Sequence, residues 1–254
     1  MILNPRLSST NETQFQRASS EIIPVWDAIL RAQKSQATNW FLVAQPDHAA
    51  LAGDIARLAR SEIFPELNEE IIQAISLHDE GWKAFDNEAS VKDRRPLSFL
   101  DLNAADLVVA WRDSIDCAGH AGALAALLVS GHFVRIGQLH LELRGKNADV
   151  EAFLSDEAAR QVKLRPAQSR SAEEIEVLTD FLQFCDLLSL YICCGSREAV
   201  EFPQRFKGQG IRLRRDDEVC RIDPRVFGGG GSLGVAARRY PSGVVQVYIP
   251  ALFA

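Results

Sequence analysis

The sequence lacks several features that would place it quickly in a class of proteins. Its five cysteines are an odd number, and no two of them form a CxxC pair. This argues against a disulfide framework or a zinc-cysteine motif and favours buried free thiols in a reducing compartment. The net charge is −6, so the chain has no basic excess with which to neutralise phosphates. We therefore expect no nucleic-acid partner.

Long apolar runs and a secretory signal are also missing. No apolar run reaches the roughly 20 residues that span a bilayer, and the first residues lack the charged-then-apolar layout of a signal peptide. We expect a cytoplasmic protein with no membrane role. The run Gly228–Gly231 is followed neither by Lys-Ser/Thr nor by a helical pattern, so it predicts a turn between strands and not a phosphate-binding loop.

What is present is an ordinary globular composition, with 254 residues of which 47% are apolar and 24% charged. A chain of this length can form a core without disulfides or cofactors. Helical spacing of apolar residues dominates as far as about residue 195, and alternating apolar residues follow it. We predict a mainly α protein, with a helical domain over residues 1–195 and a small β-rich appendage over residues 196–254. Predicted helices cover residues 22–30, 46–60, 69–81, 104–115, 119–134 and 172–194, and predicted strands cover 219–227, 233–240 and 244–249.

The last predicted helix contains one charged residue in its apolar second half. Asp186 is the only charged side chain between Phe181 and Cys194, and an isolated buried carboxylate is costly unless it is paired or bound to a metal. Gln183, Asp186 and Ser189 recur every three residues and form a narrow polar stripe. The alternative is that Asp186 accepts a hydrogen bond from a neighbouring helix or from an arginine.

Two other helices bring histidines to the face that should be buried. His48 shares a face with Leu51 and Ile55, and His78, followed directly by Asp79, lies on an apolar stripe. Mixed imidazole and carboxylate ligands suit manganese, iron or zinc better than magnesium or calcium. The sequence thus indicates a divalent metal site between helices. The alternative is that these are ordinary packing groups that bind no metal.

The ordered set of His48, His78-Asp79 and a distant Asp186, all on predicted helices, resembles the HD-domain superfamily. The run from His78 to Trp82 is similar to the HD-x-G core of that superfamily. Three further runs resemble a bacterial branch known only as a domain of unknown function. These are Gln45-Pro46-Asp47-His48-Ala49, Val129-Ser130-Gly131-His132-Phe133 and Asp186-Leu187-Leu188-Ser189-Leu190.

This resemblance implies an HD-type helical bundle and a metal-dependent hydrolase, often a phosphohydrolase. It implies that His48, His78, Asp79 and Asp186 are the primary metal ligands. His132 is a further metal-site residue, and Asp79 and His132 also have catalytic roles. Some HD proteins bind a second metal through two more histidines, for which this chain offers His120 and His132, so one or two ions per chain are expected.

Two readings compete with the hydrolase. A di-iron HD oxygenase would need both extra histidines, and a non-catalytic regulatory module would have a closed metal shell.

Many HD hydrolases have a basic residue directly after HD-x-G, where this chain has Trp82. The expected partner is a small-molecule substrate, phosphorylated if the phosphohydrolase reading holds. A homo-oligomer is compatible with the sequence. Candidate anion-binding side chains are Lys83, Arg94, Arg95 and Arg135.

Overall fold

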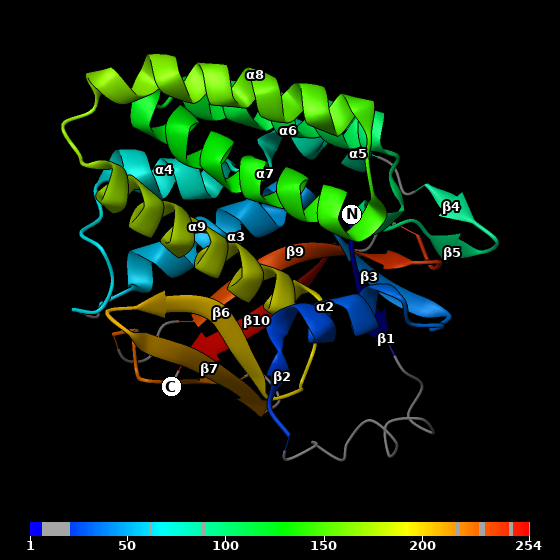
Figure 1. Cartoon of the computed structure of the whole chain (residues 1–254). Coiled ribbons are helices and arrows are strands. Elements are labelled where there is room, and N and C mark those ends of the chain that lie inside the picture. The colour runs from blue at the N-terminus through cyan, green and yellow to red at the C-terminus, as the bar shows by residue number, and fades with distance from the viewer. Residues whose placement is uncertain are drawn as a thin grey trace.

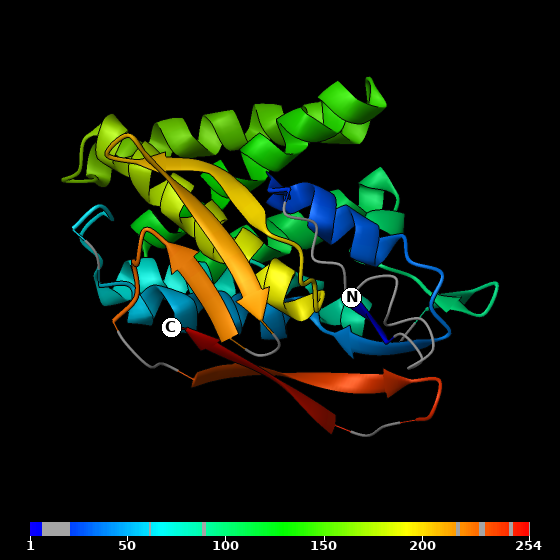
Figure 2. The ribbon, with the colours of Figure 1, turned by 90° about the horizontal axis from the view of Figure 1, so that it is seen from below.

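A layer of helices covers one side of a twisted β-sheet (Figures 1 and 2). The computed structural model describes residues 1–6, 21–60, 62–87, 90–216, 219–228, 232–243 and 246–253. Parts of the expected turn at Gly228–Gly231 and of the predicted strand 244–249 lie outside these ranges. The helices are α2 (Val25–Gln33), α3 (Gln45–Leu58), α4 (Glu69–Leu77), α5 (Lys83–Asp86), α6 (Ala104–Gly119), α7 (Ala123–Arg144), α8 (Ala148–Leu164) and α9 (Ala172–Cys193), with 3-10 turns η1 (Glu80–Trp82), η2 (Phe99–Asp101) and η3 (Arg165–Ala167).

The main sheet has eight strands and joins both ends of the chain. Its order is β1-β3-β9-β10-β8-β7-β6-β2, and the pairs β10–β8 and β2–β6 are parallel. A separate hairpin is made by β4 (Val91–Lys92) and β5 (Arg95–Pro96). The strands of the main sheet are β1 (Ile2–Arg6), β2 (Ile23–Pro24), β3 (Asn39–Val43), β6 (Val200–Phe206), β7 (Gln209–Asp216), β8 (Val219–Asp223), β9 (Ser232–Tyr240) and β10 (Gln246–Phe253).

The predicted fold class, a mainly α bundle with a small β appendage, is therefore wrong, and the fold is mixed α/β. Strand β3 pairs with β9 and sets Trp40 opposite Tyr240, so the C-terminal strands complete a sheet that the N-terminal strands begin. Four of the five residues of β3 are buried. A short strand without alternation cannot be distinguished by its period from a buried piece of helix. The predicted boundary at residue 195 remains a prediction, although one apolar core contains residues from both sides of it.

Local signals explain where the helices that carry the site begin and end. Pro46 lies in the first turn of α3, where its missing N–H costs nothing. The Asn68 side chain accepts the Ile71 N–H at 2.9 Å and caps α4. Ser171 caps α9 in a capping box with Glu174, and Gly195 follows the helix with a φ of +67°.

Helix α9 lies at the centre of the core, between the other helices and the sheet. Its Phe181 and Phe184 contact Phe206 of β6 and Phe64 of the α3–α4 connection, with ring centroids 4.8–6.1 Å apart. Such tilted and edge-to-face contacts add to the free energy of burial. This aromatic cluster holds α9, which carries Asp186, firmly against the sheet.

Helix α7 bears on the expectation that the protein has no membrane role. Among the described residues it is the one helix long and apolar enough to cross a bilayer by length and composition, yet 56% of its apolar stretch is buried inside the protein. A core helix of a soluble protein has this property. The structure is thus consistent with a soluble protein, and the cytoplasmic location remains a prediction.

Candidate metal site

His48 lies in the first turn of α3, fully buried, with both ring nitrogens engaged. Its Nδ1 is 2.8 Å from the Ser189 hydroxyl oxygen, and that hydroxyl is 2.8 Å from the Asp186 carbonyl oxygen. The carbonyl can only accept, so the hydroxyl donates to it and must accept from the Nδ1–H of His48. The Nε2 of His48 therefore has a free lone pair in the neutral ring. It lies 2.8 Å from Asp79 Oδ2, a separation that requires a proton or a cation between the two atoms.

In its neutral form, the His78 ring is the same tautomer as the His48 ring. Its Nδ1 lies 2.7 Å from the Ile75 carbonyl oxygen, so Nδ1 carries a proton, and in the neutral ring the lone pair of Nε2 faces the site. This Nε2 is buried without a hydrogen-bond partner among the described residues. It lies 3.3 Å from Asp186 Oδ1 and 3.7 Å from Asp79 Oδ2. In metal sites a carbonyl typically fixes the ligand histidine in this way.

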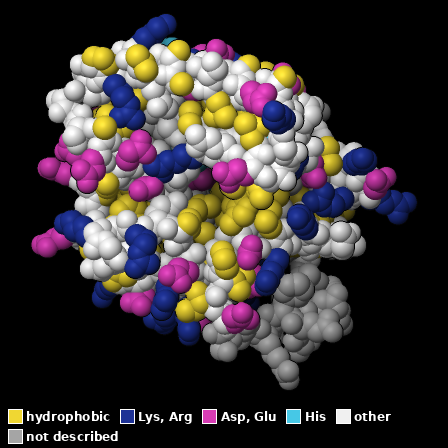
Figure 3. All heavy atoms as spheres, in the orientation of Figure 1, with side chains coloured by type: hydrophobic (Ala, Val, Ile, Leu, Met, Phe, Trp, Pro, Cys, Tyr) yellow, Lys and Arg dark blue, Asp and Glu magenta, His cyan; other side chains and the backbone are white. Residues whose placement is uncertain are grey.

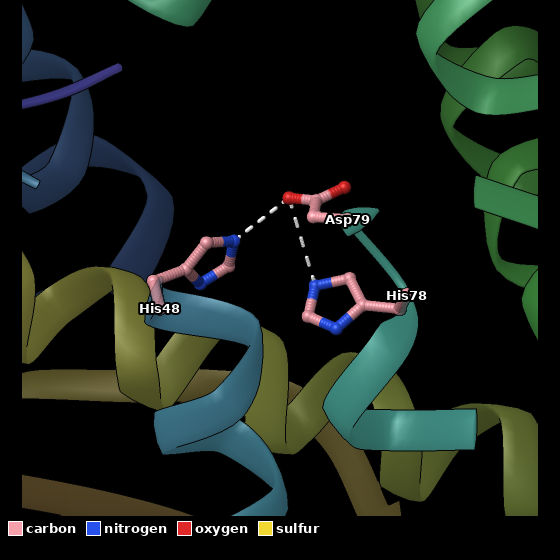
Figure 4. A group of neighbouring side chains, drawn as sticks. All are labelled: His48, His78 and Asp79. Atoms are coloured by element: carbon pink, nitrogen blue, oxygen red, sulfur yellow. Dashed lines mark hydrogen bonds and ion pairs between the residues drawn. The ribbon is translucent and has the colours of Figure 1, made fainter. Parts of the chain in front are cut away.

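Asp79 reaches the site because α4 ends earlier than its sequence pattern suggests. The apolar stripe predicted a helix as far as residue 81, but α4 ends at Leu77 and His78 is its C-cap. Asp79 has φ −117° and ψ 22°, outside the helical region. The turn directs the Asp79 carboxylate between the rings of His48 and His78, as Figure 4 shows. Consecutive residues of a straight helix would diverge by about 100°.

Gly81 allows this turn to approach α6. Its N–H donates to the Ser114 hydroxyl at 3.0 Å. A Cβ at this position would lie 2.3 Å from the Ala110 carbonyl oxygen and 2.5 Å from the Ser114 nitrogen. The glycine of the HD-x-G run is thus required for close packing, and the contact with Ser114 was not predicted.

His132 of α7 is also part of the cluster. It is buried, its ring centroid is 5.2 Å from that of His78, and its Nδ1 has no hydrogen-bond partner in the described part of the chain. His120 does not join, because it caps the end of α6 and is exposed. His140 is half-buried and also stays outside the cluster. Of the two extra histidines considered from the sequence, the structure brings only His132 to the site.

The buried side chains form two groups whose ligand atoms lie within 4.8 Å of one another. One group is His48, His78 and Asp79, and the other is His78, His132 and Asp186. Buried His/Asp groups of this kind could hold a metal ion, and the free Nε2 of His78 at their meeting point fits that use. Since Nδ1 of His78 is occupied by the Ile75 carbonyl, its single free nitrogen can serve only one ion.

Charges in the metal-free cluster have opposite effects on the two neighbouring histidines. Burial lowers the pKa of His78, but the negative charges of Asp79 and of Asp186, whose Oδ1 lies 3.3 Å from Nε2, outweigh it and raise the pKa to about 9. Burial lowers the pKa of His132 to about 4, and the charge of Asp186 offsets this only in part. For Asp186, burial raises the pKa, but the nearby His78 and the other histidines of the cluster bring it below its usual value. A cation could replace the His78 proton between these carboxylates.

The carboxylates are the least enclosed side chains of the cluster. The side chains of Asp79 and Asp186 are 9% and 11% exposed, whereas those of His48 and His78 are 0% exposed. An ion held here would therefore have enclosed histidine ligands and slightly exposed carboxylate ligands.

Three of the four candidate anion-binding side chains already have carboxylate partners. Lys83 pairs with Glu80, Arg95 with Asp101, and Arg135 with Asp180 and Glu176. Arg94 lies in the turn of the β4–β5 hairpin with a φ of +65°. On the face drawn in Figure 3, basic and acidic side chains are interspersed, and apolar side chains gather near its middle.

Comparison with known proteins gives one match. The model of a family of proteins of unknown function, DUF3891, matches residues 30–233. The chain belongs to this family. The match includes all five cluster residues and extends into the C-terminal strands. No curated protein and no solved structure matches. The resemblance to the HD-domain superfamily stays a prediction from the motifs described above.

Proposed function

We propose that this DUF3891 protein is a metal-dependent hydrolase with one divalent ion held by His48, His78, Asp79 and Asp186, and with His132 as a further ligand beside His78 and Asp186. The observation that supports it most directly is the fixed orientation of His48 and His78. Each donates its Nδ1–H to a protein acceptor and directs the Nε2 lone pair at carboxylate oxygens. Two buried, preoriented imidazoles facing two carboxylates are a typical arrangement for a metal site.

The residues of the cluster have different chemical roles. A divalent ion in such a site supplies an activated water and polarises the bond to be broken. Asp79, whose side chain is slightly exposed, can orient the attacking water or accept its proton. His132 is neutral at pH 7, because its pKa is lowered to about 4, so its ring can exchange hydrogen bonds with substrate without adding charge. His48 and His78 are enclosed and act as ligands only.

Manganese, iron and zinc fit the mixed imidazole and carboxylate donors best. One ion per chain is favoured over two, since both candidate groups need the same His78 nitrogen. The di-iron oxygenase reading loses support for the same reason and because His120 is exposed at the end of α6. The partial exposure of both carboxylates argues against the closed shell of a non-catalytic module.

The substrate is proposed from the resemblance to HD phosphohydrolases and is a small phosphoester. The cluster itself supports hydrolysis in general more strongly than phosphate recognition. At the position where many HD hydrolases have a basic residue, Trp82 is buried and its Nε1 has no partner among the described residues. The ion would then be the main positive charge that meets an anionic substrate.

Metal content is the first test. Protein purified without chelator or added metal should contain about one equivalent of manganese, iron or zinc by elemental analysis. His78→Ala should lose it and keep its circular-dichroism spectrum. His140→Ala, in a half-buried histidine outside the cluster, is the matched control and should keep the metal. Full retention of metal in His78→Ala would refute the site.

Activity is the second test. The metal-loaded protein should hydrolyse p-nitrophenyl phosphate or bis(p-nitrophenyl) phosphate, and Asp79→Asn should abolish turnover. Hydrolysis of p-nitrophenyl acetate without hydrolysis of either phosphate would keep the hydrolase and refute the phosphoester substrate. Two irons per chain with oxygen-dependent turnover would replace the proposal by the oxygenase.

A further inference from the structure

Helix α7, which carries His132, has no cap of its own. Its N-cap residue is Gly122, which has no side chain to accept the free N–H groups of the first turn. Two of these N–H groups donate instead to a side chain of another helix. The Glu70 carboxylate Oε1, in the first turn of α4, lies 3.0 Å from the Leu124 nitrogen and 3.4 Å from the Ala125 nitrogen. A carboxylate at a helix N-terminus also interacts favourably with the helix dipole.

Gly122 is shaped to this contact. It has a φ of +152°, and a Cβ added there would lie 2.0 Å from Glu70 Oε1. A side chain at position 122 would thus collide with the carboxylate that caps the helix. The close approach of α4 to the start of α7 therefore depends on both residues.

The same interval separates this contact from the site along both helices. His78 is eight residues after Glu70, and His132 is eight residues after Leu124. At a rise of 1.5 Å per residue, each interval spans about 12 Å. Since the two helices are in contact at Glu70 and their histidine rings are 5.2 Å apart at the other end, they run in the same direction. The Glu70 contact fixes the position of α7 along α4.

We infer that Glu70 is a positioning residue that brings His132 to the metal site. Glu70 is not one of the proposed metal ligands, and it acts by fixing the axial position of α7. Loss of its carboxylate frees the first turn of α7 and lets the helix shift along α4, which moves His132 away from His78 and Asp186. This inference rests on the proposed metal site, with His132 as one of its residues.

Cobalt titration of the full-length chain tests the inference. Glu70→Ala should weaken Co²⁺ binding by roughly tenfold or more, as loss of an outer contact of a metal ligand commonly does. Glu70→Gln should stay near the wild type, because its amide oxygen still accepts the two N–H groups. Glu69→Ala removes the neighbouring exposed carboxylate, which pairs with Arg57, and should have no effect. If Glu70→Ala does not fold, Glu70→Asp, whose shorter side chain withdraws from α7, should show the weaker binding.

A double variant separates positioning from simple stabilisation. If Glu70 acts through His132, its effect on Co²⁺ affinity should vanish in a His132→Ala background. Unchanged affinity in Glu70→Ala, or the same loss with and without His132, would overturn the inference.

A crystal structure of metal-free Glu70→Ala gives a readout that needs no metal. The His78 and His132 ring centroids should lie farther apart than 5.2 Å, and an unchanged separation would overturn the inference. If the wild type binds no Co²⁺, the proposed function fails, and the crystal structure still decides the role of Glu70.

Discussion

The helical layer and the sheet differ in where their ionisable side chains lie. In β7 and β8 the arginines Arg212, Arg214 and Arg221 are exposed, and the neighbouring Leu213 and Ile222 are buried in the core. In the helical layer, three histidines and two aspartates are buried and point toward one another. The sheet has the arrangement that stability alone favours. The helical cluster has desolvation costs that folding does not require, and this difference supports the proposal that the cluster holds a metal ion.

The largest effect should come from the aromatic core that α9 shares with the sheet. Phe206→Ala removes a buried ring that contacts Phe64, Phe181 and Phe184, and it should lower the free energy of unfolding by about 3–5 kcal/mol. Urea denaturation measures this. The Co²⁺ affinity of the folded variant should stay within about twofold of the wild type, because the ring makes no contact with the cluster. A large loss of affinity would show that the metal site depends on this aromatic core.

Metal should stabilise the protein through the helical cluster alone. At free metal one hundred times above Kd, the wild type should gain about 2.7 kcal/mol of stability by linkage. Differential scanning calorimetry would record this as a higher Tm. His78→Ala should show no such gain, and His140→Ala should behave like the wild type. An equal gain in His78→Ala would mean that the ion binds elsewhere.

A smaller effect is expected where the HD-x-G turn approaches α6. Gly81→Ala introduces a Cβ within 2.5 Å of backbone atoms of α6, and it should cost about 1–3 kcal/mol as an overpacking substitution. The shift of the turn should also displace Asp79 and weaken metal binding. The matched control is Gly119→Ala, whose added Cβ has its nearest neighbour at 3.8 Å and which should be tolerated.

The last expected effect is a pH dependence of metal affinity, which leaves the fold unchanged. His78 has a pKa of about 9 without metal, so at pH 7 the ion must displace a proton from it. Affinity should rise about tenfold for each pH unit between 7 and 9 and level off above that, as measured by Co²⁺ titration in buffers of equal ionic strength. His132 is already neutral in this range and should add no slope. A flat profile would show that His78 is unprotonated before metal binds.

Much of the candidate site could be predicted from the sequence because its residues leave local signals. Asp186 is conspicuous as the one charge in an apolar helical run, and His48 lies on a helix face defined by apolar spacing. Ser189 was visible as part of the same polar stripe, although its contact with His48 was not. Glu70 left no signal, since its partners are 54 and 55 residues away in the sequence.

The sequence by itself determined the starts of α3, α4 and α9 and identified His48, His78 and Asp186 on faces that should be buried, because caps and apolar periods depend on neighbours within a few residues. Only the tertiary structure decided that β3 pairs with β9, that α4 stops before Asp79, and that His132 enters the site while His120 stays exposed. Strand pairing, helix ends and the axial position of packed helices depend on contacts between segments far apart in the chain, and the spacing of residues along a sequence does not record such contacts.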